Sequence, residues 1–291
     1  MERVLFGDNQ FFGINHMSEE KALAQAMKFQ NTSAIIDVID AAHDAGIRVF
    51  MCTTHERIAE ICDHVRANPD KYGDFQFYPC MPYAHKYANA VTEKGILEAL
   101  RSVLPTEGAL GALFGGAVSV ARKDMDRLTE LLVDAEMKMF HGLKTPVIFL
   151  QNVVTDLVLG LGMYELFATF ARHVKGRYGA EPGFISMNTP LLLDALEKVG
   201  VDNPIICSNV NKIGFRMCGG ISEYEHTMAT RRFRPIAMSV FASGAIPAEE
   251  AIDYVCKQPK IESIVFGASS AENIRRTKHL IDRQSFAPRL A

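Results

Sequence analysis

The last quarter of the chain is the part of the sequence that most constrains its fold. Between Arg234 and Lys278, two short apolar segments, RPIAMSV and IESIVFGASS, flank the helix-like segment PAEEAIDYVCKQP. A strand, a helix and a second strand within ~30 residues have the spacing of a parallel crossover. This part of the sequence therefore predicts two parallel strands connected by a helix.

A turn of small residues follows the second of these strands. The turn Gly267–Ser270 opens a further helix, which carries Arg275 and Arg276. Free backbone N–H groups and the positive end of the helix dipole favour an anion at such a turn. The sequence thus predicts a phosphate-binding site there.

Short apolar segments alternate with amphipathic segments along the whole chain, which is typical of strand–helix units on a parallel sheet. Eight strands are predicted, at residues 3–6, 48–52, 75–80, 147–150, 183–187, 204–207, 235–240 and 261–266. No G-x-G-x-x-G segment follows the first strand, which argues against an open dinucleotide-binding sheet. Strand count and alternation favour an α/β fold of the closed (β/α)8 TIM barrel type over an open doubly wound sheet.

The chain of 291 residues, 48% of them apolar, can bury one large core. Since barrels of this size commonly form one domain, we expect a single barrel domain over residues 1–291. The connection after the third strand is unusually long and predicts a helical insertion at about residues 88–145, with helices near 93–103 and 123–140. Such an insertion has room for a lid or for a contact between two copies of the chain, so a homo-oligomer formed through it is compatible with the sequence.

Composition excludes several classes of partner. The formal net charge is -3 and the isoelectric point is near 6.3, which leaves no basic field for a nucleic acid. No run of 18 or more apolar residues is present that would span a membrane. The six cysteines lack disulfide or metal-ligand spacing, and the first residues lack an apolar signal core. We expect a cytoplasmic protein with a small-molecule substrate.

In a closed barrel, the residues that follow the strands face one pocket. Here they are mostly amides, hydroxyls and imidazoles, and carboxylates are scarce, which disfavours a glycosidase carboxylate pair or a Mg²⁺ site. The ring consists of Asp8, Asn9, Gln10, Asn15, His16, Cys52, Thr53, Thr54, His55, Tyr83, His85, Lys86, Gln151, Asn152, Asn188, Ser208, Asn209, Asn211 and Ser243.

Amide side chains donate to and accept from hydroxyl groups, so this ring suits a sugar-like or phosphorylated ligand. The predicted substrate-binding residues are Asn9, Gln10, His16, Gln151 and Asn152. Imidazole, phenol and amine groups transfer protons, which makes His55, Tyr83, His85 and Lys86 the catalytic candidates. The alternative for each strand-end Asn is a helix cap, and for each His a solvated loop or a core position.

Other roles were weighed for two residue types. His16, His55 and His85 follow three successive strands, yet no H-x-H or H-E-x-x-H spacing supports a zinc site, so we expect no metal. Cys52 and Cys80 lie within predicted strands, where a buried thiol has a raised pKa, so packing is favoured over nucleophilic catalysis.

Several segments together resemble the aldo/keto reductase family. They are LFGDNQFFGIN and DAAHDAGIRVFMCT near the start, FISMNTPLLLDAL and NPIICSNVNKIGF in the middle, and the region from Arg234 to Thr277 at the end. The resemblance implies a (β/α)8 barrel and makes NADP compatible with the chain. It also implies that the turn after the last strand grips the phosphate near the adenosine. The implied cofactor-binding residues are Asn188, Asn209, Ser269, Ser270, Arg275 and Arg276.

The chain departs from the family at all four residues of the usual catalytic set. Met51 occupies the position of the family's Asp, Cys80 that of its Lys, and Asn152 or Gln151 that of its His, while its Tyr has no counterpart near His55. A general acid contributes ~100 to 10,000-fold to a rate, so a working reductase would need a different proton donor.

Three functions follow from these observations. The first is a divergent oxidoreductase that acts on a small polar carbonyl or hydroxyl compound with a non-standard proton donor. The second is a barrel enzyme that has lost the nicotinamide cofactor and acts as an isomerase, epimerase or lyase. The third is a non-catalytic binding protein.

Overall fold

The eight predicted strands form a closed barrel with the order β1-β2-β3-β4-β5-β6-β7-β8, and all neighbouring strands are parallel. The computed structural model describes residues 1–14, 18–83 and 118–284, with the backbone alone for 118–124. The strands are β1 (Val4–Gly7), β2 (Val49–Thr53), β3 (Gln76–Met81), β4 (Val147–Leu150), β5 (Glu181–Ser186), β6 (Ile205–Asn209), β7 (Arg234–Met238) and β8 (Ser263–Phe266). The predicted TIM barrel is confirmed.

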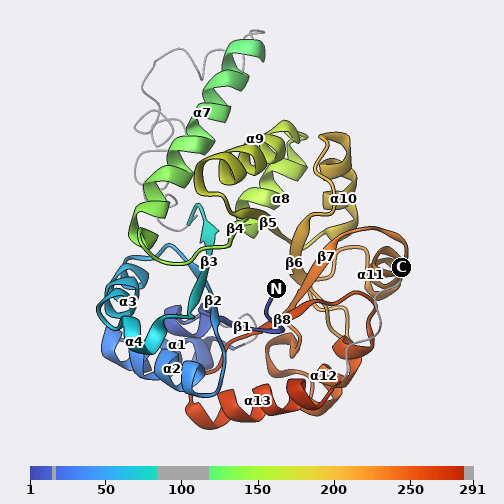
Figure 1. The fold of residues 1–291 in the computed structure, drawn as a ribbon. Helices are drawn as coiled ribbons and strands as arrows, with labels where there is room; N and C mark the ends of the chain where they lie inside the picture. The colour runs from blue at the N-terminus through green and yellow to red at the C-terminus, as the bar shows by residue number, and fades with distance from the viewer. Residues whose placement is uncertain (15–17, 84–117, 285–291) are drawn as a thin grey trace.

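Helices surround this barrel (Figure 1). They are α1 (Glu19–Lys28), α2 (Thr32–Asp44), α3 (Glu56–Ala67), α4 (Pro69–Tyr72), α7 (Val118–Met137), α8 (Asn152–Gly160), α9 (Glu165–His173), α10 (Thr189–Lys198), α11 (Ile221–Thr230), α12 (Ala248–Lys257) and α13 (Ala271–Arg283). Short turns of other helix types are η1 (Asn9–Phe12), η2 (Lys138–Phe140), η3 (Val174–Tyr178) and η4 (Ala242–Gly244). Within the described parts of the chain, every helix is too short or too polar to cross a membrane.

Strand alternation divides the core into two layers. In β2, Val49 and Met51 belong to the cluster inside the barrel, whereas Phe50 and Cys52 belong to the layer between strands and helices. Both sets are buried, which is why β2 is a continuous apolar run and not an alternating one. Met51 therefore points along the barrel interior toward the mouth, where the strands end.

One glycine is required for packing inside the barrel. Phe149 of β4 pairs in register with Gly183 of β5. A Cβ atom on Gly183 would lie 2.3 Å from the Phe149 ring. The ring thus occupies the space that a side chain at position 183 would need.

Most of the predicted insertion at about 88–145 lies outside the described residues, including the predicted helix near 93–103. Its described part is α7, which projects beyond the barrel in Figure 1 and packs against α9. The last turns of α7 bury Val133, Glu136 and Met137. This helix therefore brings a carboxylate into the protein interior near the barrel mouth.

Candidate active site

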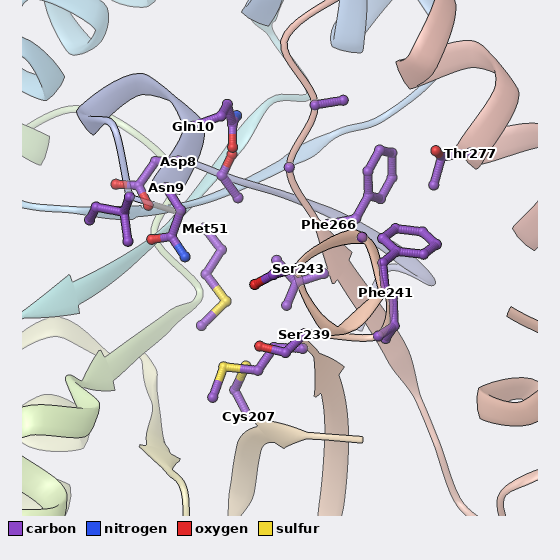
Figure 2. A pocket seen from close by; sticks show the side chains of 18 of the residues that line it. Asp8, Asn9, Gln10, Met51, Cys207, Ser239, Phe241, Ser243, Phe266 and Thr277 are labelled. Atoms are coloured by element: carbon purple, nitrogen blue, oxygen red, sulfur yellow. The ribbon is translucent and has the colours of Figure 1, made fainter. Parts of the chain in front are cut away.

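A cavity of about 580 Å³ opens at the carboxyl ends of the strands, the expected place for the site of such a barrel. Its walls come from β1 and η1, the ends of β2 to β8, the loop between β7 and α12, and the start of α13. The polar residues that line it are Asp8, Asn9, Gln10, Gln25, Thr53, Gln151, Asn152, Ser239, Ser243, Ser269, Asn273 and Thr277. Figure 2 shows Asp8 and Asn9 on one side of the cavity and Ser239 and Ser243 across from them.

The floor of the cavity is apolar and rich in sulfur. Met51, Cys80, Cys207 and Met238 line it, together with Ile185. These side chains form the uppermost part of the barrel interior, since alternate residues of each strand point inward. Burial raises the pKa of Cys80 and Cys207 well above that of a free thiol, and Asp8 adds to the effect at Cys80. Both thiols stay protonated, in agreement with the packing role predicted for Cys80.

Asp8 is the only carboxylate among the described lining residues, and no Lys, Arg or His joins it there. It occupies the N-cap position of η1 but makes no side-chain bond to that turn. Its Oδ2 instead accepts hydrogen bonds from the Thr53 N–H (2.7 Å) and the Thr53 hydroxyl (2.8 Å). Burial raises the pKa of Asp8 to about 6, against the opposing effect of the Thr53 hydrogen bonds. The cavity therefore holds one carboxyl group that titrates near neutral pH.

Four of the predicted substrate-binding residues line the cavity: Asn9, Gln10, Gln151 and Asn152. The fifth, His16, lies outside the described residues. Gln10 donates from Nε2 to the Gly7 carbonyl (2.8 Å), while its Oε1 is buried and has no hydrogen-bond partner within the described ranges. The amide lies against the turn after β8, because a Cβ on Gly267 would sit 2.0 Å from Gln10 Oε1. The absence of a side chain at Gly267 thus makes room for the Gln10 amide in the cavity wall.

The loop after β7 is strained and exposes backbone donors. Ser239, Ala242, Ser243 and Gly244 have φ angles of 53°, 45°, 57° and 93°, a region that non-glycine residues rarely occupy. In the described structure, the N–H groups of Val240 and Phe241 donate no hydrogen bond to a backbone carbonyl. All of these residues except Ala242 line the cavity, so the loop brings unpaired backbone N–H groups to its wall.

The turn after β8 contributes only part of the predicted phosphate site. Ser269 lines the cavity, and Ser270 caps α13 by accepting from the Asn273 N–H (3.3 Å). Arg275 and Arg276 are exposed on α13 and do not line the cavity. The residues of α13 that face the cavity are Asn273 and Thr277, one turn apart.

The two described catalytic candidates, His55 and Tyr83, lie beside each other but not on the cavity lining. Their ring centroids are 5.7 Å apart, and Phe12 lies 4.3 Å from the His55 ring. His55 caps α3 by accepting at Nδ1 from the Arg57 N–H (3.1 Å). Burial, then the charge of Arg57, lowers the pKa of His55. The ring is therefore neutral at pH 7. The remaining candidates, His85 and Lys86, lie outside the described residues.

A second buried carboxylate, Glu136 of α7, binds the residues that follow β2 and β3. Its Oε2 accepts from the Thr54 hydroxyl (2.5 Å) and from the Tyr83 N–H (3.1 Å). Glu136 does not line the cavity, so its role is to hold the ends of β2 and β3 together. Its position on a helix far along the chain gave no signal in the sequence.

Asn188 and Asn209, predicted to bind the cofactor, do not line the cavity either. Asn188 caps α10 by accepting from the Leu191 N–H (3.2 Å), the alternative that applies to any strand-end Asn. Asn209 is fully buried and donates from Nδ2 to the Arg216 carbonyl (2.8 Å). Each side chain thus stabilises a neighbouring loop or helix.

A search of the described residues for three or more His, Cys, Asp or Glu side chains able to hold a metal ion finds none. Of the three histidines considered for zinc, only His55 lies within these residues, and its Nδ1 is occupied by Arg57.

The sequence matches no protein-family model and no curated protein. The fold, in contrast, matches solved structures along almost its whole length. A structure described as a 2,5-diketo-D-gluconic acid reductase B has a TM-score of 0.59 at 10% identity, covering 97% of this chain and 83% of that one. For a Pseudomonas aeruginosa structure described as an aldo-keto reductase, the TM-score is 0.60 at 12% identity, over 96% and 89% of the two chains. An aldo/keto reductase from Brucella melitensis gives 0.54 at 11%, over 97% and 89%.

The protein has an aldo/keto reductase-like barrel. Within this barrel, Met51 and Cys80 line the floor at the positions where the family resemblance implies an Asp and a Lys. The charged group nearest to them on the lining is Asp8, which comes from a different strand. Asp8 belongs to the ring predicted from the sequence, but nothing local in the chain connects it with Thr53.

Proposed function

We propose that this protein is an oxidoreductase that uses a nicotinamide dinucleotide and acts on a small, polar carbonyl or hydroxyl compound. The observation that carries the proposal is the extent of the cavity. It continues from the sulfur-rich floor, past the strained loop after β7, to Asn273 and Thr277 on α13. A long, narrow ligand with one end over the floor and the other at α13 fits this course.

The chemistry along the cavity supports a dinucleotide. The N–H groups of Val240 and Phe241 would hold the pyrophosphate, since loops with free N–H groups bind anions. Gln10 Oε1 is a buried acceptor without a partner among the described residues, and a hydroxyl or amide of a ligand at this wall would satisfy it. Phe241 adds aromatic surface on the same loop. When bound, the nicotinamide would supply or accept a hydride at the substrate carbon.

The substrate end of the cavity is built from amides. Asn9, Gln151 and Asn152 surround the floor and would bind the hydroxyl groups of a sugar-like or phosphorylated compound. NADP is compatible with the site, with Ser269 near the adenosine end of the dinucleotide. His55, Tyr83, His85 and Lys86 remain the candidates predicted from the sequence for a non-standard proton donor.

A second function is favoured by the floor itself. Met51 and Cys80 leave the floor without the charged groups that the family uses, whereas Asp8 supplies one carboxyl that titrates near pH 6. A single carboxyl of this kind is suited to moving a proton next to a carbonyl, as an isomerase, epimerase or lyase does. This alternative requires no nicotinamide.

Binding of NADH and NADPH tests the first function. The chain has no Trp, so the fluorescence of the reduced cofactor reports binding without interference, and thermal unfolding gives a second readout. At 100 times the dissociation constant, a cofactor should raise the free energy of unfolding by ~2.7 kcal/mol. Gly267→Ala should weaken binding, because its Cβ displaces Gln10. Gly160→Ala, which meets no atom within 4 Å, is the matched control.

Lack of binding by either cofactor at millimolar concentration would contradict the first function. The second function would then be tested by incubating dihydroxyacetone with the protein in D₂O, with no cofactor added. Exchange of the carbon-bound hydrogens, followed by proton NMR, would support it, and lack of exchange would count against it.

A further inference from the structure

We propose that Asp8 is the group that exchanges a proton with the substrate in this cavity, and that Thr53 is the residue that positions it. The inference rests on the proposed function for the identity of the reaction. Asp8 is outside the catalytic set implied by the family resemblance and is not among the proton donors predicted from the sequence.

The position of Asp8 is the first argument. The residue follows β1 directly, lines the cavity, and lies above a floor made by Met51 and Cys80. It is 6% exposed, so its carboxyl group is reached only through the cavity. In Figure 2 its side chain lies beside Asn9, on the side of the cavity opposite Ser243. A substrate held by the amides of this mouth would therefore contact Asp8.

The hydrogen bonds of Asp8 are the second argument. Both Thr53 donors reach Oδ2, at 2.7 Å and 2.8 Å. Besides Thr53, only the backbone N–H of Asp8 itself donates to this carboxylate among the described residues, and neither Thr53 donor reaches Oδ1. An N-cap Asp normally binds the first turn of its own helix, whereas Asp8 makes no such bond. Thr53 thus fixes the orientation of the carboxyl group and leaves one oxygen for proton exchange.

The ionisation of Asp8 agrees with this role. Burial raises its pKa to about 6, so both the acid and the carboxylate are populated near neutral pH. A group with this property can give a proton in one direction and take it back in the other. The other ionisable groups on the lining, Cys80 and Cys207, have pKa values raised far above neutrality by burial.

In the direction of reduction, a bound reduced nicotinamide would supply a hydride to the carbonyl carbon, and the C=O π pair moves to oxygen. The O–H bond of protonated Asp8 breaks at the same time, and its proton forms the new O–H bond of the alcohol. The substrate gains two electrons with that hydride and is reduced, and Asp8 is left as a carboxylate. Oxidation of an alcohol is the reverse, with the Asp8 carboxylate as the base.

A matched control exists elsewhere in the barrel. Asp156 of α8 also accepts from a hydroxyl, Ser186 (2.6 Å), and from a backbone N–H, Met187 (3.3 Å). Burial raises its pKa as well. It does not line the cavity. Asp156→Asn therefore makes the same chemical change as Asp8→Asn in a similar setting, but outside the site.

The kinetic experiment uses DL-glyceraldehyde as the carbonyl probe, with whichever reduced cofactor binds. Asp8→Asn should lower kcat/KM by ~100 to 10,000-fold, while cofactor affinity from fluorescence changes less than about threefold. Asp156→Asn should keep the wild-type value. Thr53→Val removes one hydrogen bond to the charged form, so the apparent pKa in the pH profile of kcat/KM should move upward. Thr53→Ser should restore it. An Asp8→Asn enzyme with unchanged kcat/KM would overturn the inference.

A second experiment does not depend on turnover of a substrate. Carbon NMR of protein with labelled aspartate carboxyls, assigned by the signal missing from Asp8→Asn, follows the ionisation of Asp8 directly. We expect a titration near pH 6 and a shift of this signal on adding glyceraldehyde or reduced cofactor, with the Asp156 signal unmoved. Titration near the ordinary value of 3.9 for Asp, or a signal that no cavity ligand moves, would overturn the inference. If neither cofactor binds, the proposed function fails, and the NMR result with glyceraldehyde still decides the role of Asp8.

Discussion

Thr53 donates two hydrogen bonds to one oxygen of Asp8, across 45 residues of sequence and between neighbouring strands of the barrel. The neighbouring Thr54 does the equivalent for Glu136, with its hydroxyl alone. The end of β2 therefore holds two buried carboxylates, of which only Asp8 faces the cavity. Because the two carboxylates differ in position, we expect the protein to respond differently to the removal of each one.

Asp8→Asn should stabilise the protein above pH 6. The pKa of Asp8 is about 6 in the folded state against 3.8 for an ordinary Asp, so the folded state binds the proton more tightly. Stability is therefore lost as pH rises from about 4 to about 6, by up to about 3 kcal/mol, and stays reduced above that range. Asn has no charge to bury and escapes this loss. Urea unfolding of both proteins at pH 4 and pH 7.5 measures it. Equal differences at the two pH values would contradict the prediction.

Glu136→Ala should destabilise the protein at every pH near neutrality. The substitution leaves the Thr54 hydroxyl and the Tyr83 N–H without this buried acceptor, and such a loss costs about 1–3 kcal/mol per group. The free energy of unfolding from urea titration is the measurement. Glu130→Ala, on the same helix but less deeply buried, serves as the control and should cost less than about 0.5 kcal/mol. A similar loss in both variants would remove the case for Glu136 as an anchor.

Gly183→Ala should be destabilising despite its small size. The added Cβ would lie 2.3 Å from the Phe149 ring, which has no room to move inside the barrel. Overpacking of this kind costs about 1–3 kcal/mol. The double variant Gly183→Ala with Phe149→Leu should recover part of the loss, because the smaller side chain frees the space. Thermal unfolding of the three proteins tests this, and a double variant less stable than Gly183→Ala would refute it.

His55→Asn should keep most of the stability that His55→Ala loses. His55 accepts a hydrogen bond from the Arg57 N–H at the start of α3, and Asn is a good residue for that position whereas Ala is not, by about 1 kcal/mol. Unfolding measurements of the two variants give the cap contribution. Their turnover then separates a structural role from a chemical one, since a chemical role predicts loss of activity in the well-capped Asn variant too.

The strand positions could be predicted because parallel strands covered on both faces are short apolar runs. The segment 147–150 agrees with β4 at both ends, and 261–266 agrees with β8 at its last residue. The other strand ends differ from the predicted ones by one or two residues. The amide ring at Asn9, Gln10, Gln151 and Asn152 followed from the barrel alone, since strand ends converge at the mouth.

The face of α13 that lies toward the cavity could have been predicted from the helical spacing of its apolar residues. Ile274, Thr277 and Ile281 are the buried positions of this helix, which turns Asn273 and Thr277 toward the cavity and leaves the arginines exposed. The cofactor-binding roles that the family resemblance implied for Arg275 and Arg276 did not take this helical period into account.

The contact of Asp8 with Thr53 could not be predicted, because it depends on how the turn after β1 folds back over the barrel. The local sequence at the start of η1 is the same whether the Asp side chain caps that turn or binds a residue elsewhere. Glu136 was hidden for a related reason, since a single acidic residue on an amphipathic helix usually faces water.

The loop after β7 keeps three residues other than glycine, Ser239, Ala242 and Ser243, in a left-handed backbone conformation. Replacing them with glycine would relieve steric strain but would also increase the conformational freedom of the loop. Selection for heat tolerance and selection for ligand affinity would therefore pull these three positions in opposite directions. Laboratory evolution of this protein would improve one of these properties at the cost of the other.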